Sequence, residues 1–186
     1  FFGAMALQSS ALWWSFMHRL HHNHTDGDKD PYSIKKGFWY AHMLWIYDKQ
    51  TELNKETESL VADLKQNKMV MNQHNHYGKW SLGSNILFLV IAGVTTGDWI
   101  GTLMLAGLVR IFLSHHTTWF INSLCHTWGE KPMSKEISAV DNYILSIFTM
   151  GEGYHNYHHV FQADYRNGHK WWHFDPTKWI IYSMFK

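Results

Sequence analysis

Cysteine is almost absent from this sequence: among 186 residues, Cys125 is the single cysteine. One thiol excludes an intrachain disulfide and any cysteine-rich zinc or iron–sulfur site. We interpret Cys125 as a packing residue and not as a ligand. The length is that of one ordinary domain. Because the chain opens on Phe1 and stops just after an apolar run, we expect it to be a fragment.

A surplus of positive charge is also missing. Sixteen Lys and Arg residues oppose fifteen Asp and Glu residues, which gives a formal net charge of +1, and the basic residues are scattered along the chain. Domains that bind nucleic acid usually carry clustered positive charge. We therefore expect no nucleic-acid partner.

Long apolar runs are confined to one part of the chain, residues 80–96 and 99–113. A membrane-spanning helix needs about 17–25 predominantly apolar residues, so each run is of borderline length, and the alternative is a pair of buried helices in a large soluble core. Charge placement favours the membrane, because fifteen of the sixteen Lys and Arg residues lie outside residues 80–122 and Arg110 is the exception. By the positive-inside rule, both flanking regions are cytoplasmic.

These patterns predict an all-α integral membrane protein with one transmembrane hairpin at residues 80–122, turning at "TTGD". Residues 1–79 and 123–186 then form a cytosolic or interfacial cap within a single domain. Inside the cap we expect one helix over residues 1–22, an amphipathic helix over residues 57–71 and a further helix over residues 139–159.

Histidine, by contrast, is abundant, with 15 residues. "HRLHH" and "GEGYHNYHH" share one spacing, which places three imidazoles on one face of a helix, and neutral imidazole is a good ligand for zinc, copper and iron. The alternative, polar residues at a membrane interface, suits a single histidine better than two triads on one side of a membrane. The two triads are His18, His21 and His22, and His155, His158 and His159.

A third polar element lies on the second apolar helix, where Asn122 and His126 are four residues apart. Polar groups in such helices usually face the protein interior and mark function, although hydrogen bonding to a neighbouring helix is an equal alternative for this pair alone. A catalytic zinc keeps about three protein ligands, so seven candidate imidazoles fit two metal ions better than one. Glu152 precedes His155 by three residues, but "HRLHH" has no equivalent carboxylate, so we assign Glu152 to the layer outside the ligands.

Three stretches together resemble the membrane fatty acid desaturases of the acyl-CoA (stearoyl-CoA type, delta-9) family. They are "HRLHHNHTDGDKDPYSIKKGFWYAHMLW", "TTWFINSLCHTWGEKP" and "GEGYHNYHHVFQADYRNG", in the family's order. The resemblance implies four transmembrane helices beneath a cytosolic helical cap. It also implies an enzyme that uses dioxygen, two electrons and a di-iron centre, held by nine histidines and a water-bound asparagine, to place a cis double bond in a saturated acyl chain.

Carried over by motif, the resemblance assigns the metal ligands as His18, His21, His22, His126, His155, His158 and His159, with Asn122 holding an iron-bound water. It assigns the lining of a bent substrate tunnel to Gln8, Trp14, Trp45, Thr118 and Trp119, with Lys49 as a further substrate contact. The alternative for Trp14 and Trp45 is membrane anchoring, and for Lys49 a solvated surface position.

Two departures from the family pattern limit which of the family's functional residues can be assigned here. The family's first histidine pair lies upstream of Phe1, so we expect this chain alone to lack two of nine ligands and the first pair of transmembrane helices. The Arg-Asp pair that contacts the CoA headgroup in animal members is Phe16-Met17 here. The acyl carrier is therefore either CoA or another acyl lipid.

The resemblance also implies partners and a location. The electron donor is expected to be cytochrome b5 or a ferredoxin with its reductase, and the two cofactor ions to be Fe²⁺, with O₂ as co-substrate. We expect a multi-pass protein of the bacterial inner membrane or the endoplasmic reticulum whose catalytic face is cytoplasmic. The alternatives are a related membrane hydroxylase, acetylenase or ketolase, a zinc-dependent membrane hydrolase or receptor, and a non-catalytic fragment.

Overall fold

The computed structural model describes residues 1–48 and 57–185. Within these residues the secondary structure is helical, apart from isolated bridges that join Asp141 to Glu130 and to Tyr154. The all-α prediction is confirmed. The chain divides into two compact units, residues 1–20 with 51–116 and residues 21–50 with 117–186. Each unit is described by itself.

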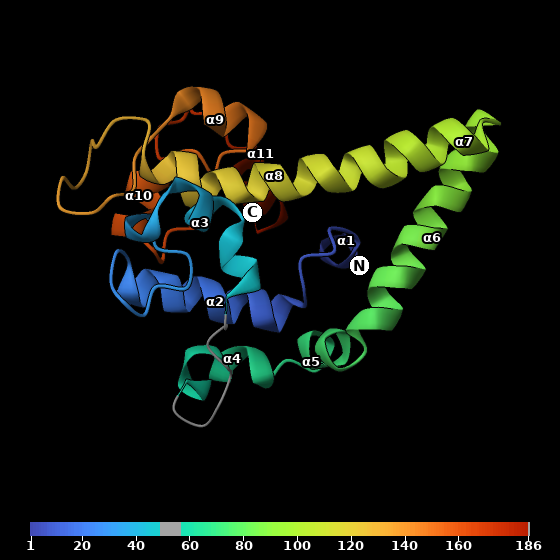
Figure 1. Ribbon diagram of the computed structural model, residues 1–186, viewed down its shortest axis with the longest axis horizontal. Helices are drawn as coiled ribbons and strands as arrows, with labels where there is room; N and C mark the ends of the chain where they lie inside the picture. The colour runs from blue at the N-terminus through green and yellow to red at the C-terminus, as the bar shows by residue number, and fades with distance from the viewer. Residues whose placement is uncertain (49–56, 186) are drawn as a thin grey trace. The chain divides into compact units, whose positions relative to one another are not determined.

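A helical hairpin dominates the first unit. Helix α6 (Tyr77–Thr96) ends at Gly97, which has φ +71°, and the chain returns through α7 (Trp99–Gly101), the π-helical η4 (Thr102–Val109) and the start of α8 (Arg110–Ser123). Figure 1 shows this reversal at α7. The turn is fixed by Asp98, whose carboxylate accepts a hydrogen bond from the Gly101 amide at 2.8 Å. The predicted turn is therefore present where the sequence places it.

In the described residues, α6 is the one helix that is both long and apolar enough to cross a membrane, and 17% of its apolar window is buried. The returning arm is divided among α7, η4 and α8, so it does not meet the same criterion. Its lone cation, Arg110, donates to the carbonyls of Ala106 and Met5 at 2.7 and 3.1 Å, and also to the Asn85 side chain. Charged groups in apolar helices persist when they are paired in this way.

The expectation of one helix over residues 1–22 is wrong. The chain forms α1 (Phe2–Met5) and α2 (Ala11–His24), with Leu7 and Ser9 in the left-handed region at φ 56° and 73°. Hydrogen bonds within the first unit replace the lost helical ones: the Ser9 amide donates to the Tyr77 hydroxyl at 3.1 Å, and the Ala11 amide donates to the Gln73 side chain at 3.0 Å. Tertiary contacts thus decide where α2 begins.

The segment predicted as one amphipathic helix over residues 57–71 is also interrupted. It contains η3 (Glu58–Val61), α4 (Ala62–Lys65) and α5 (Lys68–Asn75). Asn67 ends the first part and caps the second, because its side chain accepts from the amides of Met69 and Val70 at 2.9 and 3.3 Å. Asparagine is among the best helix N-caps.

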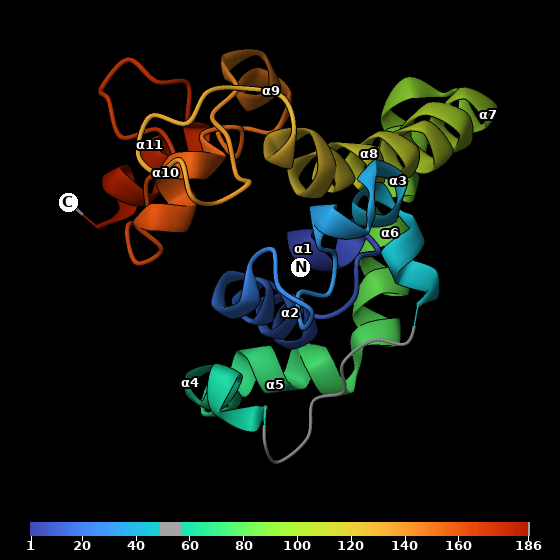
Figure 2. The ribbon, with the colours of Figure 1, turned by 60° about the vertical axis from the view of Figure 1, so that its left-hand side comes forward.

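The second unit consists of short helices joined by loops. Besides the last residues of α2 and α8, they are η1 (Ile34–Lys36), α3 (Phe38–His42), η2 (Leu44–Tyr47), η5 (Leu124–His126), α9 (Tyr143–Phe148), α10 (His155–Val160) and α11 (Pro176–Met184). Figure 2 shows α9, α10 and α11 in orange and red with their connecting loops. The helix predicted over residues 139–159 is instead α9 and α10, separated by a turn in which Gly151 has φ +107°.

Buried charge fixes the loop before α11. The Asp175 carboxylate accepts from the amides of Asn167, Gly168 and Lys178 at 2.9–3.0 Å. The buried Lys178 ammonium donates to the carbonyls of Gly168, Lys170 and His173 at 2.7, 3.0 and 3.3 Å. Together they hold residues 167–178 in one conformation.

Lys178→Ala is expected to lower the free energy of unfolding by about 2–3 kcal/mol, because three carbonyls lose a charged donor inside the protein. Chemical denaturation of the detergent-solubilised protein measures the effect. The matched control is Lys135→Ala, at an exposed lysine of the same unit, which is expected to be neutral. Equal stability of the Lys178 variant and wild type would show that the hydrogen bonds of Lys178 do not contribute to the free energy of unfolding.

Candidate metal centre

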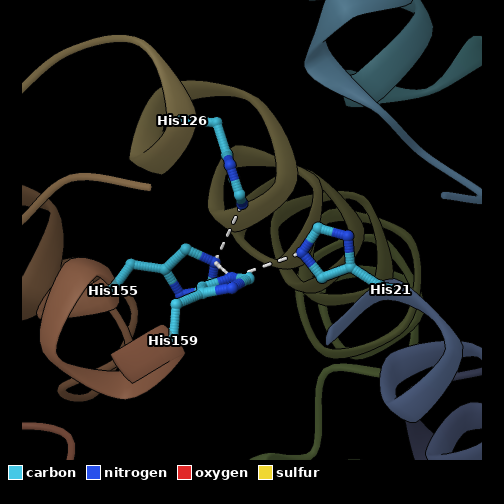
Figure 3. A group of neighbouring side chains, drawn as sticks. All are labelled: His21, His126, His155 and His159. Carbon is cyan, nitrogen blue, oxygen red and sulfur yellow. Dashed lines mark hydrogen bonds between the residues drawn. The ribbon is translucent and has the colours of Figure 1, made fainter. Parts of the chain in front are cut away.

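Four buried histidines of the second unit converge with their Nε2 atoms. His21 comes from the end of α2, His126 from η5, and His155 and His159 from α10. Each side chain is at most 6% exposed, and the four ligand atoms lie within 4.8 Å of one another. Figure 3 shows the rings turned toward a common centre. We call this set the four-histidine cluster.

The contacts within the four-histidine cluster run from ring to ring. His159 Nε2 lies 3.3 Å from His21 Nε2 and 3.0 Å from His155 Nε2, and His155 Nε2 lies 3.1 Å from His126 Nε2. His155 and His159 are one helical turn apart, so α10 presents both on one face. The arrangement brings together ligands 138 residues apart in the sequence.

Three of the four remaining ring nitrogens of the cluster face polar partners; His155 Nδ1 is buried without one among the described residues. His21 Nδ1 donates to the buried Asp30 carboxylate at 2.8 Å, and His126 Nδ1 lies 2.6 Å from the Ser138 hydroxyl. Thr25 Oγ1 lies 3.4 Å from His159 Nδ1. A metal-binding histidine typically bonds a carboxylate, carbonyl or hydroxyl through its second nitrogen, which fixes the tautomer.

Asp30 and Ser138, two of these partners, are connected through Asp26. The Asp26 amide donates to the Asp30 carboxylate at 3.1 Å, and the Asp26 carboxylate accepts from the Ser138 amide at 2.8 Å. The loop after α2 therefore sets the orientations of His21 and of His126 together. These hydrogen bonds therefore orient two rings that come from segments far apart in the sequence.

Burial keeps the imidazoles uncharged. Desolvation, and then the neighbouring histidines, hold the pKa values of His126, His155 and His159 well below the ordinary value. Desolvation, and then His21, lower the pKa of His158 to about 4. Neutral imidazole is the form that binds metals.

The donor set fits a metal ion. Because the Nδ1 of His21 carries its proton toward Asp30, the Nε2 lone pair of His21 points at the ring nitrogens of the cluster. Nitrogen lone pairs that converge in a buried site are stabilised by a cation, and burial lowers the pKa values of His155 and His159, which disfavours protons in that role. Four imidazole nitrogens suit iron, zinc or copper.

The lowered pKa values predict a pH-dependent stability of the metal-free protein. Between pH 6.5 and about 4, unfolded histidines bind protons that folded His158 does not, so the free energy of unfolding falls as the pH falls through this range. Denaturation at pH 7 and pH 5 with a chelator present measures it, and His158→Gln should reduce the slope, with the remainder due to His126, His155 and His159. A stability that does not change between these pH values would contradict the assignment.

A second pair lies beside the cluster. His22 Nε2 is 3.0 Å from His158 Nε2, and the His22 ring stacks on the His159 ring with centroids 4.2 Å apart. The triads predicted from sequence are therefore divided: His21, His155 and His159 share one cluster, whereas His22 and His158 face each other. His18 lies one turn before His22 on α2 and is half-buried.

Asn122, Cys125 and Glu152 lie close in sequence to histidines of the cluster. Asn122 is buried at the end of α8, and its Nδ2 has no hydrogen-bond partner among the described residues. Cys125 is buried, and desolvation raises the pKa of its thiol, which agrees with a packing role. Glu152 accepts from Asn167 Nδ2 at 2.9 Å, and burial raises the pKa of its carboxyl group to about 7.

The predicted substrate residues occupy both units. In the first, Gln8 donates to the Ser114 carbonyl at 3.3 Å and Trp14 is half-buried on α2. In the second, Trp45 is buried with its ring 5.2 Å from that of Tyr32, Thr118 is half-buried, and the Trp119 ring lies 5.9 Å from that of His42. Lys49 lies outside the described residues. A shared tunnel stays a prediction.

Sequence reasoning missed the partners in the outer layer, above all Asp30 and Ser138. A signal exists for Asp30: it stands in the acidic loop "TDGDKD" that follows the histidine helix, and a buried ligating histidine needs an acceptor. Three acidic residues share that loop, so the sequence alone does not choose among them. Phe16 and Met17, which replace the family's Arg-Asp pair, are fully buried in the first unit.

The sequence of this chain is similar to those of known fatty acid desaturases. The family model for fatty acid desaturase matches residues 1–186. The chain is 43% identical over 183 residues to the probable acyl-CoA desaturase of Schizosaccharomyces pombe, covering 97% of this chain and 38% of that protein. It is 40% identical over 182 residues to acyl-CoA desaturase 1 of Saccharomyces cerevisiae, covering 97% and 36%.

A plant protein, the delta-9 desaturase-like 5 protein of Arabidopsis thaliana, is 35% identical over 190 residues that cover 100% of this chain and 60% of the relative. The chain thus spans well under half the length of the two fungal relatives. The matched segment contains every histidine of the four-histidine cluster.

Proposed function

Because this chain belongs to the fatty acid desaturase family, we propose that it supplies most of the metal-binding part of an enzyme that introduces a cis double bond into a saturated fatty acyl chain. The observation that carries the proposal is the convergence of four buried Nε2 atoms on one centre. When bound, iron supplies the redox chemistry with dioxygen that removal of hydrogen from an unactivated C–H bond requires.

In this proposal His21, His126, His155 and His159 hold one ion through Nε2. Asp30, Ser138 and Thr25 keep the protons of three of these rings on Nδ1, so that the Nε2 lone pairs remain available. The close packing around the cluster excludes bulk water, which protects reactive species from side reactions. The chain's own contribution is therefore position and a dry site.

The second ion is proposed to bind His22 and His158, whose Nε2 atoms are 3.0 Å apart, together with His18, which follows from its spacing of four residues before His22 on α2. Asn122 is proposed to hold a water molecule near the ions, since its buried Nδ2 lacks a hydrogen-bond partner in the described part of the chain.

We further propose that α6 and the returning arm formed by α7, η4 and α8 span a membrane as a hairpin. The charge distribution supports a cytoplasmic location for both flanks. The acyl chain would pass Gln8, Trp14, Trp45, Thr118 and Trp119. Its carrier is either CoA, as the names of the fungal relatives suggest, or another acyl lipid, and Lys49 would support an anionic headgroup.

Lipid analysis tests this function directly. Expression of the full-length gene in a desaturase-deficient host should restore monounsaturated fatty acids, and metal analysis of the purified protein should find two irons per chain. A hydroxylated or acetylenic product would assign the same site to a hydroxylase or an acetylenase. One zinc per chain, without any modified lipid, would instead support a zinc-dependent membrane protein.

A further inference from the structure

The loop before α11 carries an exposed aromatic tip. Trp171 is 83% and Trp172 is 60% exposed, and their rings lie 5.5 Å apart. Lys170 places its ammonium 5.3 Å from the Trp172 ring. We call Lys170, Trp171 and Trp172 the loop tip. Hydrogen bonds to Asp175 and from Lys178 fix the backbone on both sides of the tip, at Gly168, Lys170 and His173, and a preordered backbone lowers the entropic cost of docking.

A series of aromatic rings leads inward from the loop tip. The Trp172 ring lies 6.1 Å from the ring of His173, and the buried His173 ring stacks on Tyr154 with centroids 4.2 Å apart and an interplanar angle of 4°. Tyr154 directly precedes His155 of the four-histidine cluster. Contacts between neighbouring rings thus connect an exposed indole with the residue adjacent to a proposed metal ligand.

Packing alone does not account for His173. Both of its ring nitrogens are buried without a hydrogen-bond partner among the described residues, and an unpaired buried polar group is costly. A phenylalanine would stack on Tyr154 at no such cost. An unsatisfied group of this kind calls for a functional explanation.

The proposed reaction needs reducing equivalents from outside. Reduction of dioxygen to two water molecules takes four electrons and four protons, of which the two broken C–H bonds supply two of each. The remaining two electrons must come from a reductant, and the two protons from solvent. A partner that delivers them one at a time need only form a small, transient interface.

We propose that the loop tip is the docking surface for an acidic one-electron donor protein, and that Trp172, His173 and Tyr154 form the route from that surface to the four-histidine cluster; this rests on the proposed function. Positive charge at Lys170 suits an acidic partner, whereas Arg166 on the same loop is paired with Asp164 at 2.6 Å. Aromatic residues and complementary charge are typical of such interfaces.

The test uses the full-length, iron-loaded enzyme in nanodiscs and measures its reduction by reduced cytochrome b5 in stopped flow. Trp172→Leu is expected to slow reduction about tenfold, and Lys170→Glu to slow it about tenfold at low salt and less at high salt. The controls Trp128→Leu and Lys135→Glu alter exposed residues of the same unit and should leave the rate unchanged.

A second measurement separates this inference from the proposed function. Single-turnover product formation after chemical reduction with dithionite bypasses docking, so Trp172→Leu should match wild type there. No product from wild type would refute the desaturase proposal itself. Wild-type rates of reduction in both loop-tip variants would overturn the docking surface.

Discussion

Replacing His159 with alanine is expected to remove iron from the four-histidine cluster and to reduce desaturation to below about one hundredth of the wild-type rate. Loss of a partner outside the ligands already costs about 10–100-fold in affinity or activity, and loss of a ligand should cost more. His159 is one of the two inner rings of the cluster, since its Nε2 contacts both His21 and His155. Metal content and product analysis of the full-length enzyme measure the effect.

The matched control is His24→Ala, at a half-buried histidine of α2 that is not a member of either candidate ligand group. It should keep its iron and its activity. Circular dichroism should show the same helix content for both variants, because His159 contributes to a ligand set more than to the apolar core. Wild-type iron content and activity in the His159 variant would refute the assignment of the cluster.

The helical spacing of the histidines could be predicted from sequence, whereas their division between two groups could not. His155, His158 and His159 share a face of α10, yet His158 pairs with His22 and the other two join His21 and His126. Which ring meets which depends on how helices more than 100 residues apart in the chain approach each other. Local periodicity contains no such information.

The positions at which helices begin and end were likewise only partly predictable from the sequence. Residues 6–10 contain neither Gly nor Pro, but the chain leaves the helix there because Tyr77, His74 and Gln73 form hydrogen bonds with polar groups of Ser9, Ser10 and Ala11. The turn at Gly97 and Asp98, by contrast, depends on residues within the turn itself. Sequence therefore predicted the hairpin turn and missed the start of α2.

Asp30→Ala is expected to weaken metal binding by about 10–100-fold. The carboxylate accepts from His21 Nδ1 at 2.8 Å and from the amides of Asp26 and Tyr32 at 3.1 Å. Without it, the His21 ring is free to rotate and to move its proton to Nε2, which removes the lone pair from the site. Asp30 therefore acts as a positioning residue, through His21.

Competition with a chelator on the folded protein measures the metal affinity apart from stability. Asp28→Ala, at an exposed carboxylate of the same loop, is the matched control and should bind metal as wild type does. Asp30→Asn keeps an acceptor oxygen and should recover part of the affinity. Because the His21 ring itself remains as a ligand, excess iron should restore occupancy and desaturation in the Asp30 variant. A variant that stays inactive when fully loaded with iron would show that Asp30 acts on the reaction by another route.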